Sequence, residues 1–217
     1  MEILLLGVEA LNFLRKEGFP VLKAGLAVDA DQAASVASAI GFPVALKISS
    51  PDVIHKTEAA GVRVCLSHED EVRKAFRGLV DGFALQGPGK RVDGVMVQRM
   101  GTGLEFIVGS LNDKQFGPVL MFGLGGIFAE AMKDVSFRLI PIEPRDAREM
   151  IGDLQGSMVL TNPRGEALDL AGIEHFLLKV SRLIEEHKEI QEMDLNPVFV
   201  SSGGIEICDA RMKIGRV

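Results

Sequence analysis

The first half of the chain alternates amphipathic, helix-like segments with short apolar runs that are typical of strands. Leucines recur at near-helical spacing over residues 4–14, and a glycine followed by a proline ends that pattern at 18–20. A capping-box pattern over 29–32 opens an alanine-rich helical segment. The next segment, 43–48, is apolar except for Lys47 and predicts a buried strand.

A polar loop over residues 49–60 separates that strand from a second short one at 62–66. A helix is predicted next, because capping residues precede apolar residues at helical spacing. A stretch with glycine and proline at 86–90 ends this half. We place a subdomain boundary there, between 1–91 and 92–217.

The second half is dominated by strand-like runs. These cover 95–100, 105–110, 116–122, 127–140, 193–200 and 205–210. Amphipathic helices are predicted over 144–154 and 166–187. Because no strand–helix–strand crossover unit repeats along the chain, the pattern favours an α+β protein with antiparallel sheets over a doubly wound parallel sheet.

Composition and charge limit the classes of function. The 217 residues are 47% hydrophobic and 25% charged, as in an ordinary globular protein. The net charge is -6 and the basic residues are scattered, which argues against nucleic-acid binding. No apolar run approaches the roughly 20 residues of a membrane span. We expect a cytoplasmic protein that binds neither nucleic acid nor a membrane, and this composition is compatible with a small phosphorylated ligand.

A glycine-rich segment over 123–126 is similar to a phosphate-binding loop. It lies between two predicted strands and does not open a helix, as a dinucleotide-binding fingerprint would require. A tight turn explains Gly125 and Gly126 as well as a phosphate cradle does. Both glycines are therefore candidates that depend on their neighbours.

The strand that follows this loop has a polar face. Alternation over 135–139 places Arg138 on one face, with Glu130 and Asp134 in phase with it, and apolar residues on the other. Such an ordered set of acids and an arginine is typical of a binding cleft. A solvent-exposed sheet face would show the same alternation.

Lys47 and His55 are candidates for handling phosphate. Lys47 is a charge inside an apolar strand, so its ammonium must reach water at the strand end or an anion such as phosphate. His55 lies in the polar loop beside Lys56, where it is exposed enough to meet a partner. A neutral imidazole can attack phosphorus and hold the phosphoryl group. An ordinary solvated loop histidine is the alternative.

The final predicted hairpin carries Asn196 on its first strand and Asp209 near the end of its second. Antiparallel pairing can bring such distant residues together. Magnesium usually takes one or two protein oxygens beside phosphate oxygens and water, so this pair would suffice. The Asn-Pro dipeptide also fits a simple turn.

Taken together, these segments resemble the β subunit of ADP-forming acyl-CoA synthetases, the ATP-grasp part related to the nucleotide-binding region of succinyl-CoA synthetase. The resemblance covers nearly the whole chain, and it is carried by residues 14–20, 42–47, 50–57, 116–128, 134–138, 194–198 and 209–211. It implies an ATP-grasp fold in which two α+β subdomains with antiparallel sheets enclose a nucleotide cleft. The histidine loop would belong to 1–91 and the magnesium-nucleotide site to 92–217.

The resemblance also implies roles for individual residues. Lys47 would contact the phosphates of ATP or ADP, and Glu105 would help to hold the nucleotide. The hinge against which adenine packs would be Gln98, Arg99 and Met100, with Arg99 standing where the family commonly has an acid. Asn196 and Asp209 match magnesium ligands. His55 matches the loop histidine that relays a phosphoryl group from a phosphohistidine on the α subunit.

We therefore expect the nucleotide-binding subunit of an ADP-forming acetate (acyl) CoA ligase. It would convert acyl-CoA, ADP and phosphate to acid, CoA and ATP through a phosphohistidine relay, and only together with an α subunit that carries the CoA-binding and phosphohistidine domains. One alternative is another ATP-grasp ligase that forms an acyl phosphate directly. A second is a non-catalytic nucleotide-binding module.

Overall fold

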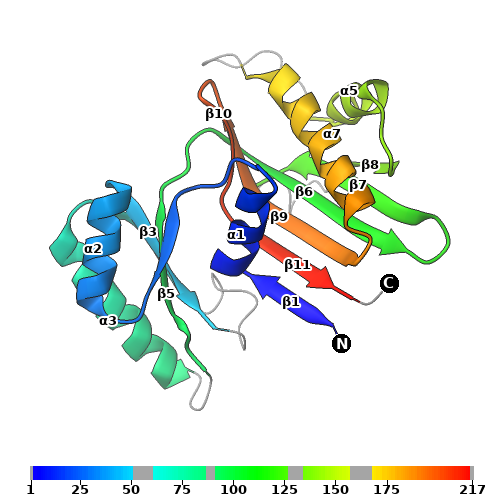
Figure 1. Ribbon diagram of the computed structural model, residues 1–217. Coiled ribbons are helices and arrows are strands. Elements are labelled where there is room, and N and C mark those ends of the chain that lie inside the picture. Colours follow the sequence, from blue (N-terminus) through cyan, green and yellow to red (C-terminus); the bar gives the residue numbers. More distant parts are fainter. Residues whose placement is uncertain (1, 51–60, 87–90, 127–133, 157–167, 216–217) are drawn as a thin grey trace. The chain divides into compact units, whose positions relative to one another are not determined.

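The computed structural model describes residues 2–50, 61–86, 91–126, 134–156 and 168–215. The chain divides into two compact units (Figure 1). Unit 1 comprises Met1–Val21 and Gly101–Val217, and unit 2 comprises Leu22–Met100. Each unit contains one antiparallel sheet, which confirms the α+β class.

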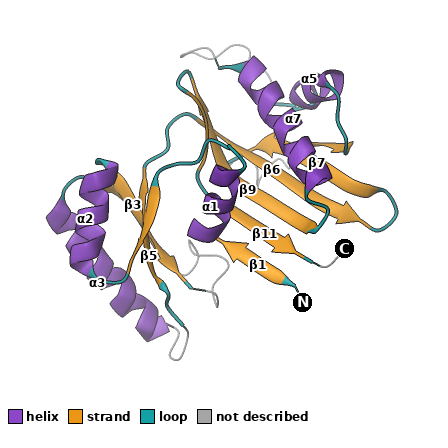
Figure 2. Cartoon of the chain, in the orientation of Figure 1, coloured by secondary structure: helices purple, strands orange, loops and turns teal. Residues whose placement is uncertain are grey.

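Unit 2 is a four-stranded sheet with two helices on one side (Figure 2). In sheet order the strands are β2 (Ala24–Ala27), β5 (Gly94–Arg99), β3 (Val44–Ser49) and β4 (Val62–Leu66). The helices are α2 (Ala30–Ile40) and α3 (Glu69–Gln86).

The predicted cap of α2 is confirmed. Asp29 accepts a hydrogen bond from the Gln32 backbone N–H at 2.8 Å, and the Gln32 side chain accepts one from the Val28 N–H at 2.8 Å. The first bond satisfies a donor that a helix start leaves unpaired, and the second fixes the residue before the cap against the first turn. Alanines on the inner face of α2 then join the apolar core of unit 2, where α2 lies against β2 and β5.

Unit 1 is built on a seven-stranded sheet. Its order is β1 (Ile3–Leu6), β11 (Ala210–Ile214), β9 (Ile190–Ser201), β6 (Leu104–Asp113), β7 (Gly117–Leu124) and β8 (Val135–Leu139), with β10 (Gly204–Ile207) also paired to β9. The helices of this unit are α1 (Val8–Lys16), α5 (Pro144–Gly152) and α7 (Leu170–Glu186).

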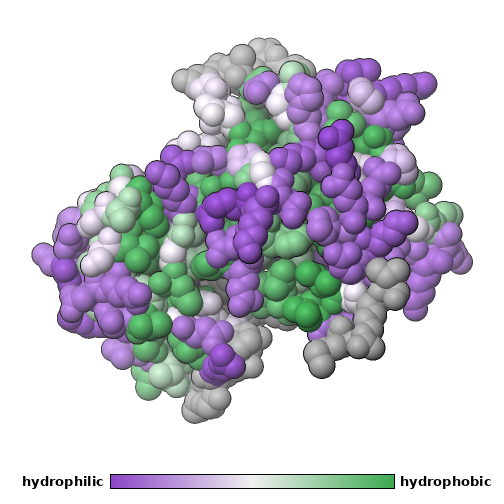
Figure 3. All heavy atoms as spheres, in the orientation of Figure 1, coloured by the Kyte–Doolittle hydropathy of each residue, from purple (hydrophilic) through white to green (hydrophobic). Residues whose placement is uncertain are grey.

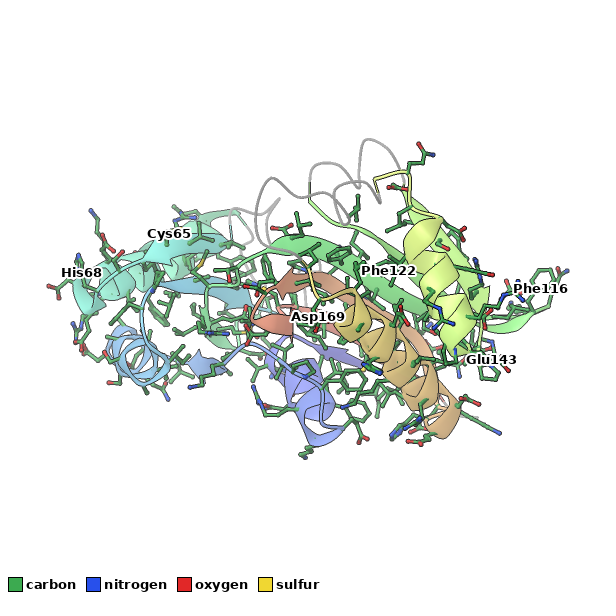
Figure 4. All side chains as sticks on the ribbon, turned by 90° about the horizontal axis from the view of Figure 1, so that it is seen from above. Cys65, His68, Phe116, Phe122, Glu143 and Asp169 are labelled. Atoms are coloured by element: carbon green, nitrogen blue, oxygen red, sulfur yellow. The ribbon has the colours of Figure 1, made fainter. Side chains whose placement is uncertain are left out.

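These three helices cover one face of the large sheet (Figure 1). Strand alternation matches this arrangement, since Phe106, Phe122 and Leu195 are buried beneath the helices while the residue before each of them is less buried. The outward surface of α1 and α7 is mainly hydrophilic (Figure 3). Figure 4 shows Phe116 at the tip of the β6–β7 hairpin, where 67% of it is exposed.

Three sequence-based interpretations differ from the observed fold. The leucine pattern near the N-terminus predicts one helix, but Leu4 lies in β1 and the helix begins only at Val8. The reason is long-range pairing, because Leu4 is matched to Lys213 on β11. The same pairing places residues 1–21 in unit 1, together with the second half of the chain. The two units therefore do not follow the predicted subdomain boundary at 91/92.

The end of unit 2 at Met100, and not at residue 91, also has a structural reason. Strand β5 pairs with β2 and β3, which places residues up to Met100 in unit 2. The predicted last strand, 205–210, is two strands, β10 and β11, that pair with different parts of β9. Among the described residues, no helix is both long and apolar enough to cross a membrane.

Candidate functional site

The pairing of β9 with β11 brings Asn196 and Asp209 together. Leu195 is matched to Ala210, and the Asn196 backbone N–H donates to the Asp209 carbonyl oxygen at 3.1 Å. The Asn196 residue is exposed and Asp209 is half-buried. One oxygen of the Asp209 carboxylate accepts from the Ala210 N–H at 2.9 Å. The predicted juxtaposition of these two residues is therefore present at the level of the backbone.

The donor chemistry of this pair fits magnesium. Carboxylate and amide oxygens are hard ligands, and magnesium commonly uses only one or two of them alongside phosphate oxygens and water. Within the described parts of the chain, no cluster of three or more His, Cys, Asp or Glu side chains forms a metal site. A metal held here would therefore depend on oxygens from a bound ligand.

A second polar pair, Asp194 and Arg211, lies next to these residues on the same two strands. The register matches Asp194 on β9 to Arg211 on β11. Burial raises the pKa of the Asp194 carboxyl, the positive charge of Arg211 lowers it, and the charges of Asp209 and Glu192 raise it further. The sequence analysis assigned no role to either residue, although both alternate with the predicted metal ligands along their strands.

The glycine loop is shaped by contact with Glu105. The Gly125 N–H donates to the Glu105 carbonyl oxygen at 2.6 Å, and a β-carbon on Gly125 would lie 2.9 Å from three atoms of Glu105. Gly126 has a φ of +70°, which favours glycine. The side chain of Glu105, an exposed residue, lies beside Gly126. Gly125 and Gly126 thus lie directly against one predicted nucleotide-binding residue.

The polar face of β8 is not exposed to solvent. Its arginine contacts acidic side chains elsewhere in unit 1. Arg138 donates to the Asp153 carboxylate at 2.8 Å and lies 3.5 Å from that of Glu149, so it ties β8 to α5 and its C-terminal end. These contacts lower the pKa of Asp153, chiefly through the hydrogen bond from Arg138. The apolar face is the exposed one instead, with Phe137 53% exposed.

Two acids, Asp134 and Glu130, are predicted to share the polar face with Arg138. Asp134 is buried and accepts hydrogen bonds from the backbone N–H groups of Gln155 and Gly156, at 2.7 and 2.8 Å. It therefore anchors the segment after α5. Glu130 lies outside the described residues, and its nucleotide-binding role stays a prediction.

In unit 2, Lys47 and Gln98 lie on the sheet face that α2 and α3 do not cover. The register matches Lys47 to Met96 and Gln98 to Ala45, so these side chains share one face. The opposite face carries Leu46 and its apolar neighbours against the helices. Lys47 is half-buried and Gln98 is fully buried.

The remaining hinge residues continue from the end of β5. Arg99 lies on the other side of the strand from Gln98, and its N–H donates to the Lys23 carbonyl oxygen at 3.0 Å. The Met100 N–H donates to the Pro43 carbonyl oxygen at 3.3 Å. Backbone hydrogen bonds therefore hold the predicted hinge residues in place. His55 lies outside the described residues.

A groove of about 600 Å³ lies elsewhere in unit 1, along α7. Its lining comes from α7 and from Glu17 and Phe19, and mixes acidic with basic side chains. None of the predicted site residues lines it. The groove therefore gives no support to the nucleotide site.

The family model of an ATP-grasp domain matches residues 2–214. The β subunit of acetate–CoA ligase (ADP-forming) I from Pyrococcus furiosus is 40% identical over 206 residues, which cover 94% of this chain and 89% of the relative. Acetate–CoA ligase (ADP-forming) I from Archaeoglobus fulgidus is 43% identical over 96% of this chain. The chain spans only 31% of the length of that second relative.

Solved structures agree with these similarities. An acetyl-coenzyme A synthetase 1 from Ca. Korarchaeum cryptofilum, in complex with coenzyme A and Ca-AMPCP, has a TM-score of 0.93 at 43% identity, covering 98% of this chain and 93% of the other. The same protein with coenzyme A and Mg-AMPPCP has a TM-score of 0.83 at 42% identity, with the same coverage, and its phosphohistidine segment points towards the nucleotide binding site.

Proposed function

Because the chain belongs to the ATP-grasp family, among the β subunits of ADP-forming acetyl-CoA synthetases, we propose that it binds a magnesium-nucleotide complex and transfers its terminal phosphoryl group. The overall reaction is acyl-CoA, ADP and phosphate to acid, CoA and ATP. The observation that carries the proposal is the pairing of Asn196 with Asp209 on adjacent strands.

In this proposal, Asn196 and Asp209 hold the magnesium ion, and the ion neutralises charge on the phosphates. The carboxylate of Asp209 is well suited to the task because one of its oxygens is already oriented by the Ala210 N–H. The Ca. Korarchaeum cryptofilum relative binds Mg-AMPPCP, which supports the choice of metal and nucleotide.

The nucleotide itself is assigned to residues of both units. Lys47 contacts the phosphates, and adenine packs against Gln98, Arg99 and Met100. Glu105 helps to hold the nucleotide, beside the loop of Gly125 and Gly126. Glu130 and Arg138 complete the proposed set, although Arg138 already has two carboxylate partners on the side of α5. Arg138 is therefore the member of this set with the strongest competing structural role.

We assign the phosphoryl relay to His55. The unprotonated nitrogen of its imidazole attacks the phosphorus of a phosphohistidine, and an N–P bond forms as the N–P bond of the donor breaks. The terminal oxygen of ADP then attacks the same phosphorus, which releases the imidazole and yields ATP. A phosphohistidine segment in the similar Ca. Korarchaeum cryptofilum protein supports this route.

We further propose that the chain is active only with an α subunit that binds CoA and carries the phosphohistidine. The Pyrococcus furiosus relative of similar length is a β subunit. The Archaeoglobus fulgidus relative contains more than this region in a single chain. Both arrangements support a catalytic unit larger than the 217 residues.

The test combines the chain with a co-purified α subunit and measures ATP formed from acyl-CoA, ADP and phosphate. We expect ATP from the mixture and none from either subunit alone. With ATP labelled in the γ-phosphate, His55 should become labelled, and His55→Ala should abolish transfer. The matched control is His68→Ala, since His68 is an exposed histidine in unit 2.

Other outcomes separate the two rival functions. Retained transfer in His55→Ala, with an acyl phosphate trapped on the enzyme, would instead support a ligase that activates its acid directly. Nucleotide binding without transfer in any mixture would support a non-catalytic module. The relay proposal fails in either case.

A further inference from the structure

Arg211 occupies a position next to the proposed metal ligands. It follows Asp209 by two residues at the start of β11, so both side chains leave the same face of the sheet, about 7 Å apart along the strand. The register matches Arg211 to Leu6 on β1 and to Asp194 on β9. The helices lie on the other face, where Met212 is fully buried.

The guanidinium of Arg211 is incompletely satisfied. Its Nε atom is buried and has no hydrogen-bond partner within the described part of the chain. It forms no ion pair with Asp194, although the two residues face each other across the strands. A buried charged donor without an acceptor is costly, which distinguishes Arg211 from arginines that serve packing.

Arg73 and Arg138 show how this chain satisfies a structural arginine. Arg73 lies within 3.3 Å of three carboxylates, and Arg138 lies within 3.5 Å of two. Both bridge secondary-structure elements. Among the described residues, Arg211 has acids as neighbours but no such contact, and its Nε atom lacks an acceptor.

The charges around Arg211 are arranged for a ligand that carries both signs. Asp194 faces Arg211 across the two strands, and Asp209 precedes Arg211 by two residues, so acidic and basic side chains lie together on this face. Lys213, the next basic residue on that face, is engaged with Glu2 at 3.1 Å. A magnesium–phosphate complex would supply the cation that Asp209 needs and the oxygens that Arg211 needs.

From these contacts we infer that Arg211 is an anion subsite for the phosphoryl group, beside the Asn196–Asp209 metal pair. The inference rests on the proposed function and adds a residue to it. The ligand class is a tetrahedral phosphoryl oxyanion, either the terminal phosphate of the nucleotide or free phosphate. A guanidinium suits it because two parallel N–H groups can hold two phosphate oxygens.

Such a contact stabilises the reacting group rather than the fold. Negative charge spreads over the equatorial oxygens during phosphoryl transfer, and fixed donors aimed at those oxygens lower the barrier. We expect Arg211→Gln in the complete enzyme to lower the rate of phosphoryl transfer by about 100-fold or more, as for other lost oxyanion donors. Arg211→Lys, which keeps the charge but loses the fork, should retain part of the rate.

The competing explanation is that Arg211 only compensates Asp194. The double variant Arg211→Gln/Asp194→Asn tests it, because it removes both charges of the pair. A subsite predicts that the double variant unfolds at the wild-type temperature and still lacks transfer. Recovery of transfer to near the wild-type rate would overturn the inference. The matched control is Lys213→Gln, which removes a charge from the same strand face.

Binding measurements identify the source of the anion and separate this inference from the proposed function. Weaker binding of Mg-ATP than in the wild type, with Mg-ADP binding unchanged, indicates the terminal phosphate. A raised KM for phosphate alone indicates free phosphate. Wild-type binding and transfer in Arg211→Gln would overturn the subsite while leaving the proposed function intact, whereas a wild-type protein that binds no Mg-nucleotide would overturn both.

Discussion

Gly125 has no room for a side chain because the backbone and β-carbon of Glu105 lie against it. This contact explains why a glycine stands there, whether or not phosphate binds to the loop. Asp209 is constrained differently, since its backbone pairs with Asn196 while its side chain remains half-buried. At the scale of single residues, the loop is restricted by steric contact and the proposed metal site is positioned by strand pairing.

Gly125→Ala is expected to destabilise the protein by about 1–3 kcal/mol, because the new methyl group would force Glu105 to shift. The measurement is urea unfolding followed by circular dichroism. Gly78→Ala is the control, since Gly78 lies in α3 with no atom within 4 Å of its added β-carbon. That change should be neutral or stabilising by up to ~1 kcal/mol. Equal stability of the two variants would contradict the steric account.

Asp209→Asn should weaken magnesium-dependent nucleotide binding by at least about tenfold, which is roughly 1.4 kcal/mol. The physical reason is the loss of the only full negative charge in the Asn196–Asp209 pair. Isothermal titration with Mg-ATP is the measurement. Glu174→Gln serves as control, because Glu174 pairs with Arg148 on the helical side of unit 1. Unchanged affinity in Asp209→Asn would remove Asp209 from the metal site.

At the scale of elements, the C-terminal end of α7 is held by a histidine between two acids. His187 caps α7, lies 3.0 Å from the Glu189 carboxylate and 3.6 Å from that of Glu17, and meets the Phe13 ring edge-on. The hydrogen bond to Glu189 raises the pKa of His187, burial lowers it, and the charge of Glu17 raises it. The net pKa is raised, so the charged imidazole stabilises the link between α1 and α7.

This arrangement predicts a pH dependence of stability. Because the folded pKa of His187 lies above its unfolded value of about 6.5, the contribution is complete below that pH and is lost as pH rises through the folded pKa. Urea unfolding should show wild-type stability falling as the pH rises above about 6.5, by no more than ~2 kcal/mol from this residue. His187→Gln should flatten that slope, and His68→Gln should not. An identical slope in all three proteins would contradict the assignment.

At the scale of the whole molecule, the proposed nucleotide residues are distributed over both units. Lys47 and Gln98 lie in unit 2, while Glu105, Asn196 and Asp209 lie in unit 1. A ligand that binds the native state, and not the unfolded chain, must shift the unfolding equilibrium toward the native state. Ligand binding can therefore be measured through global stability.

Mg-ATP should raise the thermal midpoint of the intact chain, by the equivalent of about 2.7 kcal/mol at a concentration of 100 times its dissociation constant. Differential scanning fluorimetry measures the shift, and removal of magnesium with EDTA should abolish most of it. Asp209→Asn provides the matched variant, which should show little dependence on magnesium. A full shift in the presence of EDTA would contradict a metal-assisted site.

The sequence by itself determined the types of most elements and several members of the candidate site. Residue periodicity and caps are local properties, so α2 and the strand that carries Lys47 could be predicted from short windows. Asn196 and Asp209 could be matched because they lie in neighbouring strands close in sequence. The family was predictable because its motifs recur along nearly the whole chain.

Only the tertiary structure decided which distant segments pair. Leu4 belongs to a strand because it meets Lys213, more than two hundred residues away, and no local pattern carries that information. For the same reason, alternation in β8 identified its two faces but not that Arg138 would meet α5. The incomplete hydrogen bonding of Arg211 likewise depends on what surrounds it in the folded sheet. Periodicity determines which side chains share a face, and long-range pairing decides what that face contacts.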